Sequence, residues 1–267
     1  MAHSDQTEIL SRRQMLALLR WQVDAGVDEL VSATSWNRFA EPPKGPSTVA
    51  PQPAVKRPAT TTLTAPDRLT TAELNNVSNL ATLKERLDSF DGGALQRYAT
   101  NTVFGDGAAG ARIMFVGEAP GAEEDRQGVP FIGPGSKLLD RMLAAIGLTR
   151  GDVYIANTLY WRPPGNRTPT LEELNTTMPF LMRQIELVGP KIIVPLGGPA
   201  AQTLLNQTSS IIRLRGNWFN FNSRPHEVGG LTIPAIPMFH PDFLLQQPKQ
   251  KRQAWQDLKA IRDRLSG

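Results

Sequence analysis

The chain has 267 residues, a formal net charge of +4 at pH 7 and no cysteine. Without thiols it cannot form disulfides, use a cysteine nucleophile or hold an iron–sulfur cluster through cysteine ligands. No apolar run approaches the ~18 residues that a membrane span requires, and no signal sequence is evident, so we expect a cytoplasmic protein with no membrane partner. The modest positive charge permits a polyanionic partner but is often incidental.

Two segments precede the main part of the chain. Residues 8–31 place apolar side chains at helical spacing, which predicts an amphipathic helix that either packs on the rest of the chain or binds a partner. Residues 41–66 are rich in proline and poor in large apolar residues, which is typical of an extended linker. We therefore expect an N-terminal helical segment over 1–40, a linker over 41–66 and the main domain over 67–267.

The main domain alternates predicted helices and strands. Apolar runs predict strands at 111–116, 153–157, 191–196 and 232–238. Helical spacing and capping signals predict helices at 71–90, 136–146, 170–188, 199–205 and 248–265. Residues 211–221 fit neither pattern well. This alternation predicts an α/β fold, a three-layer α/β/α sandwich around a central four-stranded parallel sheet.

The sequence Gly-Glu-Ala-Pro-Gly-Ala-Glu-Glu-Asp at 117–125 comes directly after the first predicted strand. Ligands of open α/β sheets bind beyond the carboxyl ends of the strands, and right-handed crossovers bring all four ends to one edge. The loop from 117 to Phe131 is therefore an active-site candidate. A tight turn with solvated acids is the alternative.

Later segments reach the same predicted edge. Asn157 ends the second strand, a glycine pair follows the third at 197–198, and His240 follows the fourth. The Asn157 amide can donate and accept together, as reading the edge of a base requires, or it can cap the next turn. His240 is either structural or catalytic, and Phe131 is either a core residue or a stacking platform.

Basic residues lie on two further segments. Arg162 and Arg167 belong to a proline-braced loop that either holds phosphates or is a solvated surface loop. Trp255 and Leu258 of the last predicted helix are expected to face inward. This helix starts near His240, where a nucleic-acid backbone could lie. Its first basic residues are Lys249, Lys251 and Arg252.

Together these motifs resemble the family 4 uracil-DNA glycosylases. The resemblance covers about residues 70–265, in the family's order and spacing. It rests on the segments 117–125, 128–133, 138–140, 162–167, 196–198, 212–216, 240–245 and 251–258, together with Asn157. It implies the glycosylase fold and a monofunctional enzyme, monomeric and nucleoid-associated, that removes uracil from single- or double-stranded DNA in base excision repair. The opening motif has no lysine to form a Schiff base, which argues against lyase activity.

The resemblance also implies how the base is held. Phe131 would stack on the flipped uracil, and Asn157 would read its O4 and N3–H edge. His240 would hydrogen-bond O2 as negative charge develops on the departing base. Leu244 or Leu245, just after His240, could enter the vacated base stack.

The acids of the motif would act on the sugar. The resemblance implies that Glu118 and Glu124 stabilise the sugar cation and position the attacking water. Ala119 and Gly121 complete the base-binding wall. They stand where better-known uracil glycosylases carry an aspartate and a tyrosine, which concern water activation and thymine exclusion.

The family normally carries a four-iron four-sulfur cluster. Its cysteines align near Phe90, Gly93, Trp161 and Met178, and none of these is cysteine. We therefore expect no cluster and no metal, with ordinary packing in their place.

Two rival hypotheses remain. One is a non-catalytic or slow-turnover binder of uracil or abasic DNA. The other is a generic nucleotide-binding α/β protein whose 117–121 turn cradles phosphate. Glu123 and Glu124 disfavour the second rival, because carboxylates repel phosphate.

Overall fold

The computed structural model describes residues 71–224 and 230–266. The predicted N-terminal segment 1–40 and the linker 41–66 lie outside these residues, so both stay predictions. Within the described ranges, no helix is long and apolar enough to cross a membrane.

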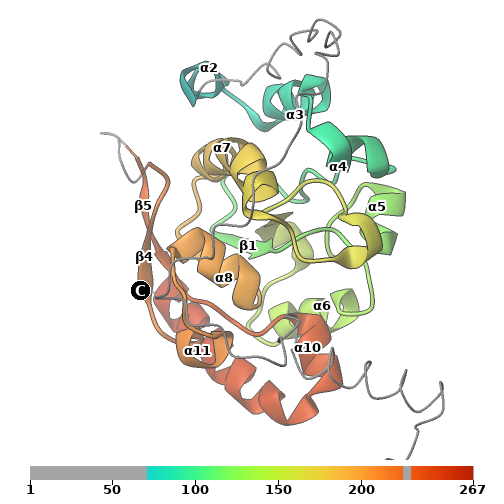
Figure 1. Cartoon of the computed structure of the whole chain (residues 1–267). Helices are drawn as coiled ribbons and strands as arrows, with labels where there is room; N and C mark the ends of the chain where they lie inside the picture. The colour runs from blue at the N-terminus through green and yellow to red at the C-terminus, as the bar shows by residue number, and fades with distance from the viewer. Residues whose placement is uncertain (1–70, 225–229, 267) are drawn as a thin grey trace, which may run out of the picture. The chain divides into compact units, whose positions relative to one another are not determined.

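Five strands of the described chain form one sheet in the order β2–β1–β3–β5–β4, of which β1, β4 and β5 are labelled in Figure 1. They are β1 (Ile113–Gly117), β2 (Val153–Asn157), β3 (Ile192–Pro195), β4 (Phe219–Asn222) and β5 (Thr232–Ala235). The four strands predicted from sequence are parallel to their neighbours, as expected. The fifth strand, β4, was not predicted and pairs antiparallel with β5 at the edge of the sheet. An antiparallel edge strand on an otherwise parallel sheet is common in α/β folds.

Helices cover both faces of the sheet. The long ones are α3 (Leu80–Ser89), α6 (Ser136–Ala144), α7 (Leu171–Val188), α8 (Gly198–Leu205) and α11 (Lys251–Ser266). The short ones are α2 (Thr71–Asn75), α4 (Gly93–Tyr98), α5 (Ala122–Gln127), α9 (Ile211–Leu214) and α10 (Pro241–Gln246), with 3-10 turns η1 (Arg150–Asp152), η2 (Pro164–Asn166) and η3 (Pro248–Gln250).

Buried strand residues alternate between the two faces. Phe115 of β1 packs with α6 and α11 on one side, whereas Met114 and Val116 pack with α7 and α8 on the other. Figure 1 shows α7 above β1 and α6 and α11 below it. A strand can be this uniformly apolar only when both of its faces are covered. The predicted three-layer α/β/α arrangement is therefore confirmed.

Several helix boundaries differ from the prediction. The helix predicted over 71–90 is two helices, because the Asn79 side chain accepts from the backbone N–H of Thr82 at 2.9 Å and starts α3 anew. The start of α7 is as predicted, with a capping box between Thr170 and Glu173. The predicted opening loop contains α5, and α10 follows β5. Both helices have six residues, too few for a periodic signal.

Candidate active site

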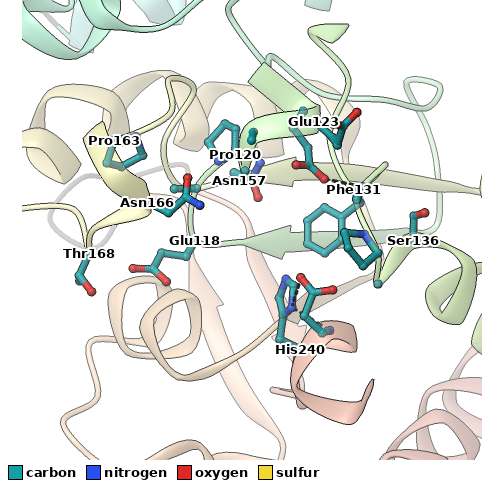
Figure 2. Close-up of a pocket in the computed structure, with 18 of the residues that line it drawn as sticks. Glu118, Pro120, Glu123, Phe131, Ser136, Asn157, Pro163, Asn166, Thr168 and His240 are labelled. Carbon is teal, nitrogen blue, oxygen red and sulfur yellow. Dashed lines mark hydrogen bonds and ion pairs between the residues drawn. The ribbon is translucent and has the colours of Figure 1, made fainter. Parts of the chain in front are cut away.

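A cavity of about 430 Å³ lies beyond the carboxyl ends of β1 and β2. We call it the base cavity. All the residues that the sequence analysis assigned to catalysis or base binding line it (Figure 2). They are Glu118, Ala119, Gly121, Glu124, Phe131, Asn157 and His240.

The floor of the base cavity depends on a glycine. Gly117 and Asn157 are paired across β1 and β2. A Cβ on Gly117 would lie 2.5 Å from Asn157 Oδ1 and 2.7 Å from the Phe131 ring, so only glycine lets the amide and the ring approach this closely. Asn157 is 2 % exposed, and its amide makes no hydrogen bond with any residue of the described chain. A buried amide without a partner is suited to a ligand.

Phe131 is held in an unusual conformation. Its φ of 53° lies in the left-handed region, which an aromatic residue rarely adopts and which costs on the order of 1 kcal/mol. Arg150 of η1 holds the backbone there. It donates to the carbonyl oxygen of Phe131 at 3.0 Å and to that of Pro130, and it pairs with Asp106 at 2.7 Å. Sequence reasoning missed Arg150, because no motif connects it to a loop 19 residues away.

Glu124 holds the same loop from the other side. Its Oε1 accepts from the backbone N–H groups of Ile132 at 3.0 Å and Gly133 at 2.8 Å. Its Oε2 lies beside Gly121, where an added Cβ would come within 2.7 Å. Glu124 thus braces the Phe131 loop, and only Oε2 remains for the sugar or water role expected from sequence.

His240 is the N-cap of α10 and packs beside Phe131, with ring centroids 5.3 Å apart. Its Nδ1 accepts from the backbone N–H of Asp242 at 3.2 Å. A ring nitrogen that accepts cannot carry the proton, so the neutral ring carries it on Nε2. Burial lowers the pKa of His240, against an opposite effect of the Asp242 and Glu124 carboxylates. The ring is therefore a neutral donor at neutral pH.

Glu118 stands at the end of β1 on the other side of the cavity. Its backbone oxygen accepts from the Thr158 hydroxyl at 2.6 Å, which fixes the turn. Its Oε1 is buried and has no hydrogen-bond partner among the described residues. Burial raises the pKa of this carboxyl. Figure 2 shows the side chain pointing toward the wall that carries Thr168.

Residues 104–259 match the model of the Uracil DNA glycosylase superfamily. The chain belongs to this superfamily. It is 42 % identical over 171 residues to the Type-4 uracil-DNA glycosylase of Archaeoglobus fulgidus, covering 62 % of this chain and 83 % of that protein. It is 38 % identical over 192 residues to the Type-4 enzyme of Sulfurisphaera tokodaii (70 % and 85 % covered) and 41 % identical over 165 residues to that of Thermotoga maritima (61 % and 82 % covered).

The structure places the two positions that the sequence resemblance singled out, Ala119 and Gly121. Ala119 lines the cavity and carries no group that could activate water. Gly121 is the N-cap of α5, and the Glu124 carboxylate occupies the space beside it. A tyrosine at 121 would displace Glu124 from that space.

The positions expected for the family 4 cluster cysteines do not fit a cluster. Trp161 is 1 % exposed, and its ring would lie 2.5 Å from a Cβ on Gly92. Met178 packs against a different core cluster from Trp161. No group of three or more His, Cys, Asp or Glu side chains in the described ranges is arranged to hold a metal ion. Phe90, Trp161 and Met178 supply apolar side chains for packing, and none of the four positions supplies a thiolate.

Aromatic side chains pack together in this part of the core, where Phe90, Trp161 and Phe180 also line a cavity of about 930 Å³. The rings of Phe90 and Phe180 meet edge to face at 5.1 Å, and those of Tyr160 and Trp161 do so at 6.4 Å. The Trp161 indole N–H donates to the Thr102 hydroxyl at 3.1 Å. We call Phe90, Tyr160, Trp161 and Phe180 the aromatic brace.

The arginines of the 162–167 loop already have partners. Arg167 lines the base cavity but pairs with Glu173 through two contacts of 2.5 and 2.8 Å. Arg162 donates to Asn166 Oδ1 at 2.6 Å and does not line the cavity. A DNA phosphate would therefore share these guanidinium groups with existing acceptors.

The residues after His240 separate into buried and exposed positions. Leu244 is 1 % exposed and belongs to the core, so it cannot enter a base stack, whereas Leu245 is 39 % exposed. Trp255 is 38 % exposed and does not face fully inward as expected, whereas Leu258 does, at 2 %. The predicted DNA-contacting residues Lys249, Lys251 and Arg252 are all exposed.

Proposed function

We propose that this chain is a monofunctional uracil-DNA glycosylase, which hydrolyses the bond between uracil and deoxyribose and leaves an abasic site for base excision repair. The observation that carries the proposal is the convergence of the Phe131 ring, the Asn157 amide and the His240 ring on one cavity. A stacking face, a combined donor and acceptor, and a separate donor are what a flipped uracil requires. The similarity to Type-4 uracil-DNA glycosylases supports the same substrate.

The reaction separates charge, and the cavity has a group for each sign. As the bond to the base breaks, the sugar becomes positive and the uracil negative. In the proposed complex, His240 donates from Nε2 to O2 of the departing base. The carboxylate of Glu118 and Oε2 of Glu124 supply negative charge near the sugar. The hydroxyl of a water molecule then joins C1′, and its remaining proton goes to the uracil anion.

Extrusion of the base from DNA costs a few kcal/mol, which stacking on Phe131 and contacts to the backbone would offset. We assign the backbone contacts to the exposed side chains of Lys249, Lys251 and Arg252, with Arg162 and Arg167 at the opposite loop. Leu245 is the proposed wedge residue. We further propose that the enzyme works as a monomer in the cytoplasm, on the nucleoid, and needs no iron–sulfur cluster.

The proposal is tested with oligonucleotides that carry one uracil, in single- and double-stranded form, treated with alkali after incubation. Strand scission at uracil and not at a matched thymine is expected. Without alkali the strand should stay intact, and borohydride should trap no covalent adduct, because the enzyme is monofunctional. The absence of scission at uracil in both forms would overturn the activity.

A slow-turnover binder of uracil or abasic DNA is the second candidate, and Ala119 favours it because no aspartate activates water there. The two are separated by measuring binding and single-turnover excision on the same oligonucleotide. Tight, uracil-dependent binding without release of the base would support the binder. Complete release of uracil from the bound oligonucleotide under single-turnover conditions would exclude a non-catalytic binder.

A further inference from the structure

Asp242, the second residue of α10, carries an oxygen with no hydrogen-bond partner among the described residues. Its Oδ1 is buried and makes no hydrogen bond in the described part of the chain. The oxygen lies against Gly135, the N-cap of α6, where an added Cβ would come within 2.5 Å. Burial of a charged oxygen without a donor is costly. The absence of a side chain at position 135 leaves room for this oxygen. The backbone does not require glycine there, because φ of Gly135 is an ordinary −73°.

The carboxylate of Asp242 stands beside the ring that is proposed to act on the base. Its Oδ2 lies 3.6 Å from Nδ1 of His240, while the backbone N–H of the same residue donates to that nitrogen at 3.2 Å. In the neutral ring, Nδ1 uses its lone pair for the backbone N–H, and Oδ2 of the half-exposed carboxylate accepts from no described residue. If Nδ1 gains a proton, it can no longer face the backbone N–H, and the carboxylate becomes its acceptor.

We propose that Asp242 is a positioning residue for His240. The carboxylate of Asp242 accepts a hydrogen bond from the protonated His240 ring and thereby sets the pH below which the ring leaves its active orientation. This inference rests on the proposed glycosylase function for its catalytic consequence. The neutral ring keeps Nδ1 on the α10 backbone and aims Nε2–H at the base. The protonated ring turns Nδ1 toward Asp242, loses the helix cap and misaligns Nε2.

Three neighbours bear on the charge of His240. Asp242 approaches from α10, Glu124 from α5, and the uncharged Phe131 ring from the loop between α5 and α6. The charge of Glu124 is already partly compensated, because its Oε1 accepts two backbone N–H groups. Asp242 accepts no hydrogen bond at Oδ1, and its Oδ2 faces Nδ1 of His240 at 3.6 Å. Asp242 is therefore the carboxylate that most favours the protonated ring, and its removal shifts protonation to lower pH.

The direct test is an NMR titration of the histidine rings in the full chain, without DNA. The three histidines are assigned by single substitutions at His3, His226 and His240. In Asp242→Asn, the His240 midpoint is expected to move to lower pH by about one unit, while the other two stay in place. Glu123→Gln is the matched control, because its exposed carboxylate also lines the cavity but pairs with Arg126. An unmoved His240 midpoint in Asp242→Asn, or an equal move in Glu123→Gln, would overturn the proposal.

Gly135→Ala is a second, independent variant. The new methyl group would displace the carboxylate from its space, so the midpoint should move in the same direction but less far. Thermal melting establishes that each variant is folded. A folded Gly135→Ala protein whose His240 titrates as in the wild type would contradict the geometry on which the proposal stands.

The catalytic consequence is read from the pH profile of uracil excision. Its acid limb should move to lower pH in Asp242→Asn, in step with the NMR midpoint. A limb that stays in place while the midpoint moves would overturn the positioning role and would point to Glu118, whose carboxyl lies apart from His240. If the wild type excises no uracil, the proposed function fails, yet the titration still decides the pairing of Asp242 with His240.

Discussion

The base cavity and the aromatic brace share one stretch of chain, residues 157–161, but treat polar groups in opposite ways. The cavity leaves Glu118 Oε1 and Asp242 Oδ1 buried without partners. In the brace, the Tyr160 hydroxyl donates to Gln184, and the Trp161 indole donates to a threonine. Buried polar groups without partners weaken a fold, whereas buried polar groups with hydrogen-bond partners stabilise it. We infer that the packing of the brace offsets the loss of stability caused by the unpartnered polar atoms of the cavity.

The connection between the two regions is short. Asn157 lies in the cavity and Trp161 lies in the brace, and Thr158 between them bonds to the backbone of Glu118. Burial raises the pKa of Tyr160 well above its ordinary value, so its hydroxyl stays a donor. A change in the brace should therefore act mainly on stability, and a change in the cavity should act mainly on activity.

The largest expected effect is that of Trp161→Ala. Removal of a fully buried indole from the brace should reduce the free energy of unfolding by about 3–5 kcal/mol. Urea denaturation measures this loss, and Trp161→Phe, which keeps an aromatic ring, should lose clearly less. If both variants unfold like the wild type, the brace does not stabilise the fold and the comparison breaks.

His240→Ala should have the opposite profile. Loss of the Nε2–H donor to the departing base should lower the single-turnover excision rate by roughly 10²–10³-fold, as expected for the removal of one donor to a developing anion. The melting temperature should fall by only a few degrees, because the ring is one-third exposed and the variant loses one N-cap hydrogen bond of α10. A rate near that of the wild type would contradict the assigned role of His240.

Gly121→Ala tests how the cavity holds the Phe131 loop. The added methyl group would press on Oε2 of Glu124 and loosen its hold on the backbone of Ile132 and Gly133. Excision should fall roughly tenfold through the misplaced Phe131 ring, with a smaller loss of stability than in Trp161→Ala. Ala122→Gly, at the exposed next position, is the matched control and should excise uracil normally.

The smallest effect is expected at the surface pair of Arg167 with Glu173. The hydrogen bond from Arg167 and other donors lower the pKa of Glu173 to about 2. The ionised form therefore adds stability above the ordinary glutamate pKa, and this is lost as the pH falls toward 2. The pair is solvent-screened, so Glu173→Gln should lower the melting temperature at pH 7 by only a few degrees. The difference in melting temperature between Glu173→Gln and the wild type should vanish as the pH approaches 2. A difference that does not change with pH would contradict this prediction.

The sequence predicted most of the fold, because four apolar runs bounded by glycine, asparagine or proline are a clear strand signal. It missed β4, since four alternating residues are too few to count as a pattern. It also could not predict which of Leu244 and Leu245 is buried, because a six-residue helix is too short to show which of its faces is apolar.

The cavity was predictable where motifs follow strands and not where distant segments meet. Glu118, Asn157 and His240 each end or follow a predicted strand, so their convergence follows from the parallel sheet. The contacts of Arg150 with the Phe131 loop and of Asp242 with Gly135 join segments whose spacing in sequence carries no signal. Such contacts determine how a site residue is positioned, and they can be recognised only in the three-dimensional structure.

The central claim is that the base cavity releases uracil and does not merely bind it. The most direct measurement is a single-turnover reaction, with enzyme in excess over a uracil-containing oligonucleotide, in which free base and abasic strand are quantified together. We expect equal amounts of free uracil and abasic strand, and no free thymine from the matched control. Saturated binding with no free uracil would contradict it.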